Sequence, residues 1–489
     1  MTRHAWMQCA AAAAVALTVG CGGGDDADAQ PPPDAGTTVI AVHAVDTLQS
    51  AGADEHAAQT PDDATRLRSY SLAAGAEVPV LVATGTGTAG EYQLALGDGE
   101  VSYVALGKDV VVGAREAVDF GWQRIGRTGS TPAASGTTLV VSGEGLAPWQ
   151  DGDYLVFDAP VGTTYRTLRS GATGLPDVGG TALASATIAW DGRALVSAAA
   201  GDPLFVLQSR DEVLPDGSTL SHAPSVLRID DLEQADGANP ITGSFTATAP
   251  ETLALDGRFT QFVAALGGAT LDDVGARVDV YPQRFGKGDG NSYFDTAASF
   301  FPAGPDDATY HVSYGNPFPA EWPEFIDFAV LGSRDYALPG SRLPATQAYA
   351  SVGIFRSRAA AEAGPVVPTL GAPTHVTLDG RDATGDLSGV TAAPLVAWDA
   401  PTLGHAKGYV VLVNELYVLS DVLVTYKTAA TYYTAGTSLR FLPDTFATGK
   451  TYFLQIFAMD GEGMDLVHAP HRSPMESAYA AVLTGSIQR

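Results

Sequence analysis

The chain has 489 residues, of which 45% are hydrophobic, and this is enough apolar material for several hydrophobic cores. Its 55 acidic residues outnumber its 27 basic residues, so the formal net charge is −28 at pH 7. A surface with this charge repels the phosphates of nucleic acids, and the composition therefore excludes a nucleic-acid partner.

The first twenty residues have the pattern of a secretion signal. Arg3 gives a basic start, and an apolar run rich in alanine follows from residue 5 to residue 19. This run is shorter than the roughly twenty residues that a membrane-spanning helix needs. It has the length of the apolar region of a signal peptide. We therefore predict that residues 1–20 are a signal peptide and that the protein is exported.

The end of this leader carries a second signal. Residues 17–21 (LTVGC) resemble the lipobox of bacterial lipoproteins: Gly20 and Cys21 match it, whereas Thr18 stands where the family usually has leucine. The resemblance implies that the thiol of Cys21 carries lipid. Such a protein would be anchored in the cell envelope, at the outer membrane or the cell surface. Secretion after ordinary signal cleavage, without lipid, is the alternative.

Residues 21–37 are rich in glycine, aspartate and proline. Glycine makes such a segment flexible, proline extends it, and aspartate keeps it solvated, so we predict a tether. The two cysteines of the chain, Cys9 and Cys21, lie no later than the start of this segment. The rest of the chain must therefore fold without disulfide bonds.

From residue 38 onward, short runs of β-branched and aromatic residues alternate with clusters of glycine, proline and aspartate. Typical runs are residues 91–96, 101–106 and 109–112. Only residues 258–266 and 357–363 favour a helix. This spacing predicts an all-β chain of tandem β-sandwich-like domains.

Three segments suggest domain boundaries. Residues 128–136 (TGSTPAASG) and the Pro-Asp-Gly turn at 215–217 read as joints, and residues 363–373 read as a linker. The predicted organisation has three parts. It consists of an N-terminal β-rich region at 38–220 with a joint near 128–136, a second β-rich region at 221–371, and a C-terminal domain at 372–485.

The C-terminal domain resembles a fibronectin type III domain. The resemblance rests on residues 394–401 (PLVAWDAP) with Trp398, on residues 408–413 (GYVVLV), and on residues 450–460 (KTYFLQIFAMD). Apolar residues at every second position in the last segment indicate a strand with one face buried against another sheet. The resemblance implies a β-sandwich and a role in adhesion, spacing or carbohydrate association. Another β-sandwich with similar patterning is the alternative.

Residues 85–90 (GTGTAG) satisfy the GxGxxG pattern of dinucleotide sites. Such a site needs a helix after the last glycine, and residues 91–96 alternate like a strand instead. We therefore predict that residues 85–90 form a hairpin loop.

His468 and His471 have the spacing of metal ligands, but Pro470 argues against a helix and no cysteine or carboxylate cluster completes the site. A pair of histidines in an exposed loop is the simpler interpretation.

Acidic clusters offer oxygen ligands for calcium, the one cofactor that the sequence suggests. The candidates are Asp379, Asp382 and Asp386, with a second cluster at 289–295. Neither cluster follows the helix–loop–helix calcium pattern, and turns rich in aspartate are the alternative.

Residues 314–325 (YGNPFPAEWPEF) combine aromatic residues with prolines. Rigid aromatic rings often line binding sites for sugars or peptides, so Tyr314, Phe318 and Trp322 form a candidate binding surface. Rings that cover a core beneath a rigid loop would give the same pattern.

The sequence contains neither a GxSxG nor an HExxH motif. We therefore expect a non-catalytic, lipid-anchored envelope protein for surface display, adhesion or binding of an extracellular protein or glycan. The alternative is a secreted hydrolase with a site in residues 38–371 and an accessory fibronectin type III module.

Overall fold

The regular secondary structure of the described residues is almost entirely β-strand. A computed structural model describes residues 38–50, 52–59, 67–159, 161, 164–169, 172–267, 271–284 and 296–489. This part contains 35 strands and two α-helices, which confirms the prediction of an all-β fold. No helix within it is long and apolar enough to cross a membrane. The predicted signal peptide, Cys21, the tether and the acidic cluster at 289–295 lie outside the described residues.

The first part of the fold is a sandwich of two sheets. Its strands are β1 (Thr38–His43), β2 (Val45–Gln49), β3 (Glu55–Ala58), β4 (Leu67–Leu72), β5 (Val80–Thr84), β6 (Thr86–Thr88), β7 (Glu91–Leu96), β8 (Val101–Leu106), β9 (Asp109–Val112), β10 (Val118–Asp119) and β11 (Gln123–Ile125). One sheet of the sandwich has the order β10-β1-β7-β6, and β5, β4, β8 and β9 form the other side. The remaining strands form a separate sheet with the order β11-β2-β3. Val42, Leu94 and Val104 belong to the apolar core that the two sheets enclose.

A second sandwich follows. Its strands are β12 (Thr138–Glu144), β13 (Tyr154–Ala159), β14 (Thr164–Leu168), β15 (Ala182–Ala189), β16 (Leu204–Val213), β17 (Thr219–Ile229), β18 (Ala238–Ser244) and β19 (Thr246–Ala247), with a 3-10 turn at Ala198–Ala200. The sheet β15-β12-β18 covers β14, β13, β16 and β17. Phe157 and Trp190 are fully buried between these layers because alternate residues of each strand point inward.

The third sandwich contains both helices. Its elements are β20 (Ala249–Gly257), α1 (Phe259–Ala265), β21 (Asp273–Pro282), β22 (Ala298–Phe301), β23 (Ala308–Asn316), β24 (Glu324–Tyr336), β25 (Thr346–Ser357), α2 (Arg358–Glu362) and β26 (Pro365–Val366). The helices lie where the sequence predicts them. Phe259 of α1 stacks on Phe328 of β24 with ring centroids 4.3 Å apart, so this helix closes one end of the core.

The last sandwich has a fibronectin type III-like arrangement. Its strands are β27 (Thr374–Leu378), β28 (Arg381–Asp382), β29 (Leu395–Asp399), β30 (Gly408–Ser420), β31 (Leu423–Thr434), β32 (Ser438–Arg440), β33 (Thr451–Gly461), β34 (Ser477–Leu483) and β35 (Ile487–Gln488). The sheet β28-β27-β29-β32 faces β31-β30-β33-β34. The Tyr452 hydroxyl accepts a hydrogen bond from Ala447 N at 3.1 Å, as in the tyrosine corner of such sandwiches.

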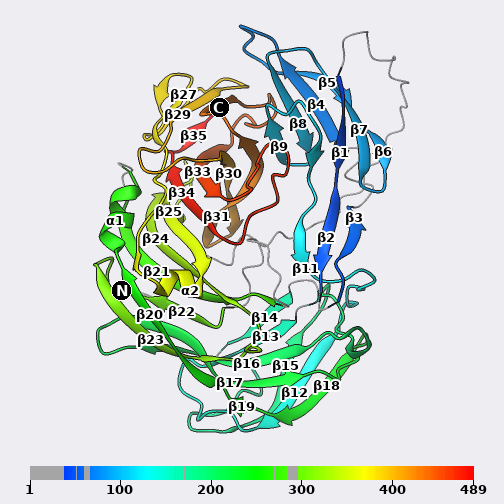
Figure 1. Cartoon of the computed structure of the whole chain (residues 1–489), viewed down its shortest axis with the longest axis vertical. Helices are drawn as coiled ribbons and strands as arrows, with labels where there is room; N and C mark the ends of the chain where they lie inside the picture. The colour runs from blue at the N-terminus through cyan, green and yellow to red at the C-terminus, as the bar shows by residue number, and fades with distance from the viewer. Residues whose placement is uncertain are drawn as a thin grey trace. The chain divides into compact units, whose positions relative to one another are not determined.

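One sheet of 18 strands runs through all four sandwiches (Figure 1). β34 pairs with β25 and joins the last two sandwiches, and β22 pairs with β17 and joins the second and third. β9 pairs with β31 in parallel, from Thr431↔Asp109 to Tyr433↔Val111, and so joins the first sandwich to the last. Residues 37–489 accordingly form one compact unit.

One predicted boundary is wrong. Residues 220 and 221 both lie inside β17, which runs without a break from Thr219 to Ile229. The Pro-Asp-Gly signal at 215–217 is the turn of the β16–β17 hairpin, where Leu214 N donates to Ser218 O at 2.8 Å. The joint at 128–136 lies between β11 and β12, and residue 371 lies between β26 and β27. The last sandwich extends beyond residue 485, because β35 pairs with β33.

The side chain of Trp398 is a sensitive test of this last sandwich. It is 4% exposed and packs edge-on against Tyr409, with ring centroids 5.1 Å apart. Trp398→Ala should lower the free energy of unfolding by about 3–5 kcal/mol, because it leaves a large cavity in the core. Denaturant titration followed by circular dichroism measures this loss. Val213→Ala is the control, since Val213 is 74% exposed, and an unchanged midpoint for Trp398→Ala would contradict the packing.

Candidate functional site

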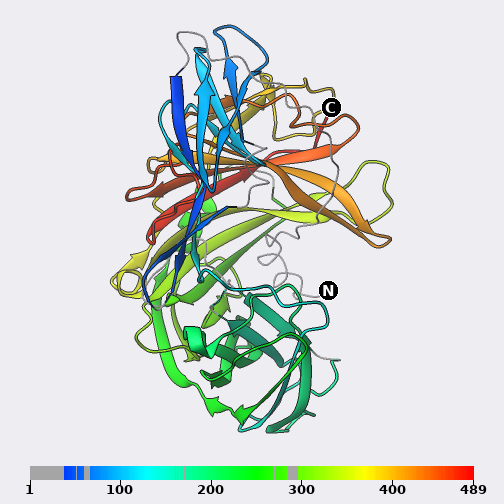
Figure 2. The ribbon, with the colours of Figure 1, turned by 90° about the vertical axis from the view of Figure 1, so that its right-hand side faces the viewer.

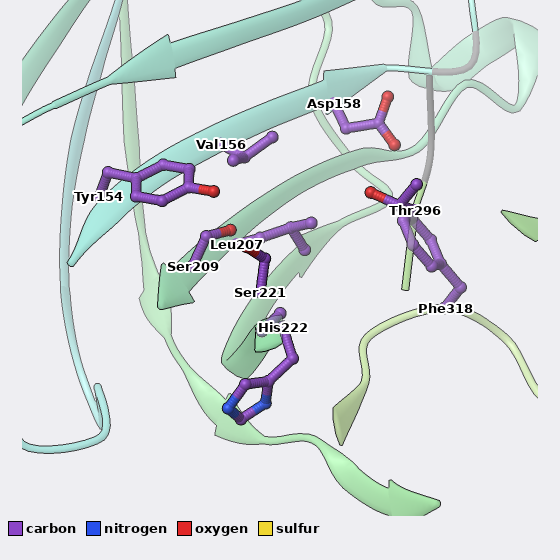
Figure 3. A pocket seen from close by; sticks show the side chains of 10 residues that line it. Tyr154, Val156, Asp158, Leu207, Ser209, Ser221, His222, Thr296 and Phe318 are labelled. Atoms are coloured by element: carbon purple, nitrogen blue, oxygen red, sulfur yellow. The ribbon is translucent and has the colours of Figure 1, made fainter. Parts of the chain in front are cut away.

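A small polar cavity lies between β13, β16 and β17 (Figure 3). Its volume is about 60 Å³. Its polar lining residues are Asp158, Ser209, Ser221, His222 and Thr296. Pockets that bind small molecules have volumes of roughly 300–1,000 Å³. This cavity therefore has room for a few water molecules, but it is too small for a substrate.

The cavity is lined by serine, histidine and aspartate, the residue types of a hydrolytic site, but in the described part of the chain these side chains do not make the hydrogen bonds that such a site needs. Asp158 forms an ion pair with Arg284, and the two side chains are only 3% and 2% exposed. The Ser221 hydroxyl donates to Asp211 Oδ1 at 2.6 Å. Among the described residues no hydrogen bond joins His222 to a serine, and Figure 3 shows the imidazole turned away from Asp158. The serine–histidine–carboxylate chain that activates a nucleophile is therefore not assembled.

The environment of His222 favours a neutral ring. Burial lowers the pKa of His222, and the carboxylate of Glu212, 3.7 Å from Nε2, opposes this effect only in part. Nδ1 is buried and has no hydrogen-bond partner among the described residues.

A second hollow of about 270 Å³ lies between residues 149–153 and 172–178. Its most buried carboxylate, Asp153, is paired with Arg210 at 2.8 Å. Burial alone would raise the pKa of Asp153. The hydrogen bonds from Arg210 and from the backbone of Gln150 outweigh burial, so the pKa lies below its ordinary value. This carboxylate therefore stays ionised and fastens the loop to β16.

The aromatic residues of the candidate binding surface are buried, which corrects the prediction of an exposed patch. Tyr314, Phe318 and Trp322 are 2%, 7% and 6% exposed. Phe318 and Trp322 stack with ring centroids 5.6 Å apart, and both pack edge-on against Phe205. The prolines of this segment hold the rings over a core, which is the alternative that the sequence left open.

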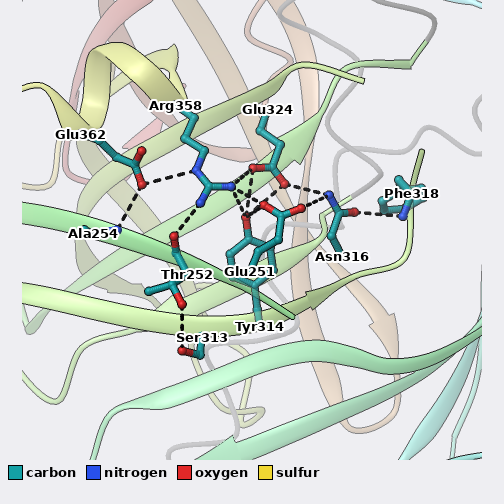
Figure 4. Close-up of polar contacts among 10 residues, drawn as sticks. All are labelled: Glu251, Thr252, Ala254, Ser313, Tyr314, Asn316, Phe318, Glu324, Arg358 and Glu362. Carbon is teal, nitrogen blue, oxygen red and sulfur yellow. Dashed lines mark hydrogen bonds and ion pairs between the residues drawn. The ribbon is translucent and has the colours of Figure 1, made fainter. Parts of the chain in front are cut away.

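The polar end of this segment forms a network that we call the arginine clamp (Figure 4). It consists of Glu251, Tyr314, Asn316, Glu324 and Arg358. Arg358 Nη1 contacts both carboxylates and lies 2.5 Å from Glu324 Oε2. The Tyr314 hydroxyl and Asn316 Nδ2 each donate to Glu324 at 3.0 Å. One guanidinium therefore holds two carboxylates that would otherwise repel each other.

The electrostatics of the clamp follow from burial. Burial raises the pKa of Glu324, and the neighbouring Glu251 adds to this effect, whereas the hydrogen bond from Arg358 lowers the pKa. Burial and the charge of Glu324 raise the pKa of Tyr314. The clamp does not line either cavity described above. Its acceptors are occupied by its own donors, so it is suited to fixing β20, β23, β24 and α2 together.

A second clamp crosses the neighbouring strands. Arg277 lies 2.8 Å from Asp279 Oδ2 and 2.9 Å from Asp327 Oδ2, and the Tyr479 hydroxyl donates to Asp327 Oδ1 at 2.9 Å. The two aspartates are directly opposite each other in the register of β21 and β24. Burial raises the pKa of Asp327 despite the charge of Arg277. This network ties β21, β24 and β34 together.

The predicted histidine pair is split. His468 is partly exposed, with its side chain 41% accessible, and it pairs with Asp465 at 2.8 Å, as expected for a loop. His471 is buried, with its side chain 3% exposed, and it stacks on Trp122 with centroids 3.8 Å apart. Its Nδ1 lies 2.9 Å from the carbonyl oxygen of Phe120. His471 therefore fixes the last sandwich to the first, and the prediction of an exposed pair was wrong for it.

The calcium candidates do not converge. Asp379 accepts from Leu395 N, Asp382 from Thr384 N, and Asp386 from Ser486 N, at 2.8, 2.9 and 2.8 Å. Each carboxylate thus closes a separate backbone contact. The described residues contain no group of three or more histidine, cysteine, aspartate or glutamate side chains placed to hold a metal ion.

The glycine-rich segment at 85–90 forms the predicted hairpin. β6 pairs antiparallel with β7, from Thr86↔Gln93 to Thr88↔Glu91. Ala89 and Gly90 at the turn both have positive φ, 55° and 82°. A hairpin of two residues needs this left-handed conformation, which explains the glycine.

Sequence reasoning missed both clamps. Their members come from positions far apart in the chain, such as Glu251 and Arg358, and nothing in the local sequence marks them as partners. One local signal could have indicated the second clamp. Arg277 and Asp279 occupy alternate positions of a strand, so they point to the same face, and the residues that follow them are apolar. A charge on the buried side of a strand requires a partner.

No family model and no curated protein matches the chain. Several solved structures have a low similarity to the chain. They include the FN1–FN3 domains of chicken CNTN1, with 10% identity, 70% of this chain and 99% of that chain covered, and a TM-score of 0.13. A multidomain fragment of titin (10% identity, 71% and 96%, TM-score 0.13) and a streptococcal ancillary pilin (9%, 64% and 95%, TM-score 0.13) are similar to the same degree. The fold assignment above rests on the strand pairing.

The arginine clamp predicts a pH-dependent loss of stability. Arg358→Ala leaves Glu251 and Glu324 facing each other, so the free energy of unfolding should fall by about 3–5 kcal/mol at neutral pH. The folded-state pKa of Glu324 is already raised, and it rises further in the variant. Folding then favours protonation of Glu324, and stability returns as the pH falls through this pKa toward the unfolded value.

Urea titrations from neutral to mildly acidic pH test this prediction. Arg342→Ala is the control, because the exposed side chain of Arg342 makes no ion pair among the described residues. If Arg358→Ala were equally destabilising at every pH, Glu324 would not be the group that the arginine holds in its ionised form.

Proposed function

We propose that the chain is a lipid-anchored protein of the cell envelope that displays or binds and does not catalyse. Residues 17–21, which end in Cys21, supply the anchor, and residues 21–37 supply the tether. The folded part is then held outside a membrane, at the outer membrane or the cell surface. Its partner is an extracellular protein or glycan, and its function is adhesion or surface display.

One observation carries the non-catalytic part of this proposal. The buried charged groups are bound to one another: Arg358 holds Glu324, and Arg277 holds Asp279 and Asp327. A catalytic acid or base needs access to a cavity that a substrate can enter. These groups instead stiffen a sheet that is already continuous. A stiff frame with neutralised interior charges supports display and binding at its outer surface.

The anchor is tested at Cys21. Cys21→Ala should abolish incorporation of labelled fatty acid and should release the protein from washed membranes, because no other residue offers the lipidated thiol. Cys9→Ala is the matched control, since Cys9 lies inside the predicted signal peptide and should not affect acylation. Continued fatty-acid labelling of Cys21→Ala would refute the anchor.

The binding part needs a separate readout. The full-length protein, immobilised in detergent, should retain specific envelope glycans or surface proteins that a denatured sample does not retain. Turnover of ester or glycoside substrates that is lost in His222→Ala would contradict the non-catalytic proposal, because His222 is the histidine in the polar cavity.

A further inference from the structure

The hairpin between β30 and β31 ends in an exposed apolar tip. Val418, Leu419, Val422 and Leu423 are 50%, 58%, 76% and 47% exposed. Only Ser420 and Asp421 lie between them in the sequence. We call these six residues the hairpin tip. Exposed apolar groups gathered at one point mark a site of interaction, whereas scattered ones do not.

The tip projects beyond the sheet that carries it. β30 pairs with β33 only as far as Leu416↔Thr451, and β31 pairs with β9 only at residues 431–433. Among the described residues no third strand pairs with the end of the hairpin, and Figure 2 shows it reaching outward in orange. Val424, next to the tip, is 1% exposed, so one face of the ribbon is covered while the tip itself is exposed.

Two lysine side chains lie at the base of the hairpin. The chain has five lysines, and two of them, Lys427 and Lys450, lie here. Their Nζ atoms share one carboxylate, Glu415, at 3.7 and 3.1 Å. Lys427 also lies over the ring of Tyr417, 5.4 Å from its centroid. Lys427, Lys450 and Glu415 give the base a formal charge of +1, and Asp421 in the tip brings the hairpin to zero, whereas the whole chain carries −28. The hairpin is thus a place where the acidic protein can approach an anionic surface.

We infer that the hairpin tip inserts into the interfacial layer of a lipid bilayer. The aliphatic side chains of the tip enter the boundary between headgroups and acyl chains. Tyr417 lies at the level where tyrosine is enriched in membrane proteins. Lys427 and Lys450 reach lipid phosphates, which compete with Glu415 for their charge. The apolar tip, the aromatic ring and the cationic base follow one another along the hairpin in the order that a membrane surface requires.

This inference does not depend on acylation of Cys21. If Cys21 is acylated, the tip is a second and weaker contact that benefits from the high local concentration of lipid. The two contacts would then fix the orientation of the folded part at the membrane. If Cys21 is not acylated, the tip alone binds, and it binds weakly.

A fluorescent probe tests the insertion in the full-length protein. Val422→Cys, made together with Cys9→Ala, is labelled with an environment-sensitive dye and mixed with vesicles of phosphatidylcholine containing phosphatidylglycerol. The dye emission should shift to the blue and should be quenched by nitroxides on the acyl chains. Val213→Cys on the same background is the matched control, because Val213 is 74% exposed and Val422 is 76% exposed. The control should show neither effect.

A second substitution separates the tip from the anchor. Adding Leu419→Asp to the labelled Val422→Cys protein should weaken insertion by about tenfold, because a buried leucine side chain contributes that much or more. The acylated protein should still float with the vesicles. Equal emission from the probes at 422 and 213 would overturn the inference. If no protein floats with the vesicles, the lipid anchor at Cys21 is refuted. The emission of the dye at residue 422 is then measured with excess vesicles. A blue shift supports insertion of the hairpin tip, and the absence of a shift overturns it.

Discussion

The parallel pairing of β9 with β31 is the constraint on which the rest of the structure depends. A parallel pair needs a long connection, and here the connection runs from the end of β9 at Val112 to the start of β31 at Leu423. Thr431 N donates to Lys108 O at 2.9 Å, so the seam is made of backbone hydrogen bonds. His471, stacked on Trp122, seals it from the side. One sheet of the first sandwich is therefore continuous with one sheet of the last sandwich, and the chain folds back on itself.

The two clamps of buried charged residues also restrict the arrangement of the strands. The arginine clamp lies within the third sandwich, and the second clamp reaches the last sandwich through Tyr479 of β34, whose hydroxyl donates to Asp327 of β24. Arg358, at the start of α2, is tied to β20 and β24, and Arg277 in β21 reaches β24. The desolvation of such buried pairs offsets much of their attraction, but loss of one partner would leave a buried charge without compensation. A rigid arrangement suits a protein that we propose to display a surface.

Local patterns in the sequence predicted the strands well. The alternation around Tyr452, and the turn at Ala89 and Gly90, depend on neighbouring residues, and the structure confirms both. Long-range contacts could not be predicted in this way. The sequence placed a boundary at 220/221 because a hairpin turn and a domain edge use the same residues. It also placed Trp322 on a surface, since composition does not report what covers a ring.

Hydrogen exchange at the amide of Thr431 tests the central claim most directly. This amide points away from β30 and is bonded to the carbonyl of Lys108. If one sheet joins the first and last sandwiches, it should exchange as slowly as the amide of Thr484, which is bonded to Leu454 O inside the last sandwich. Exchange of Thr431 at the rate of a solvent-exposed strand edge, with Thr484 still protected, would show that the two sandwiches are not joined.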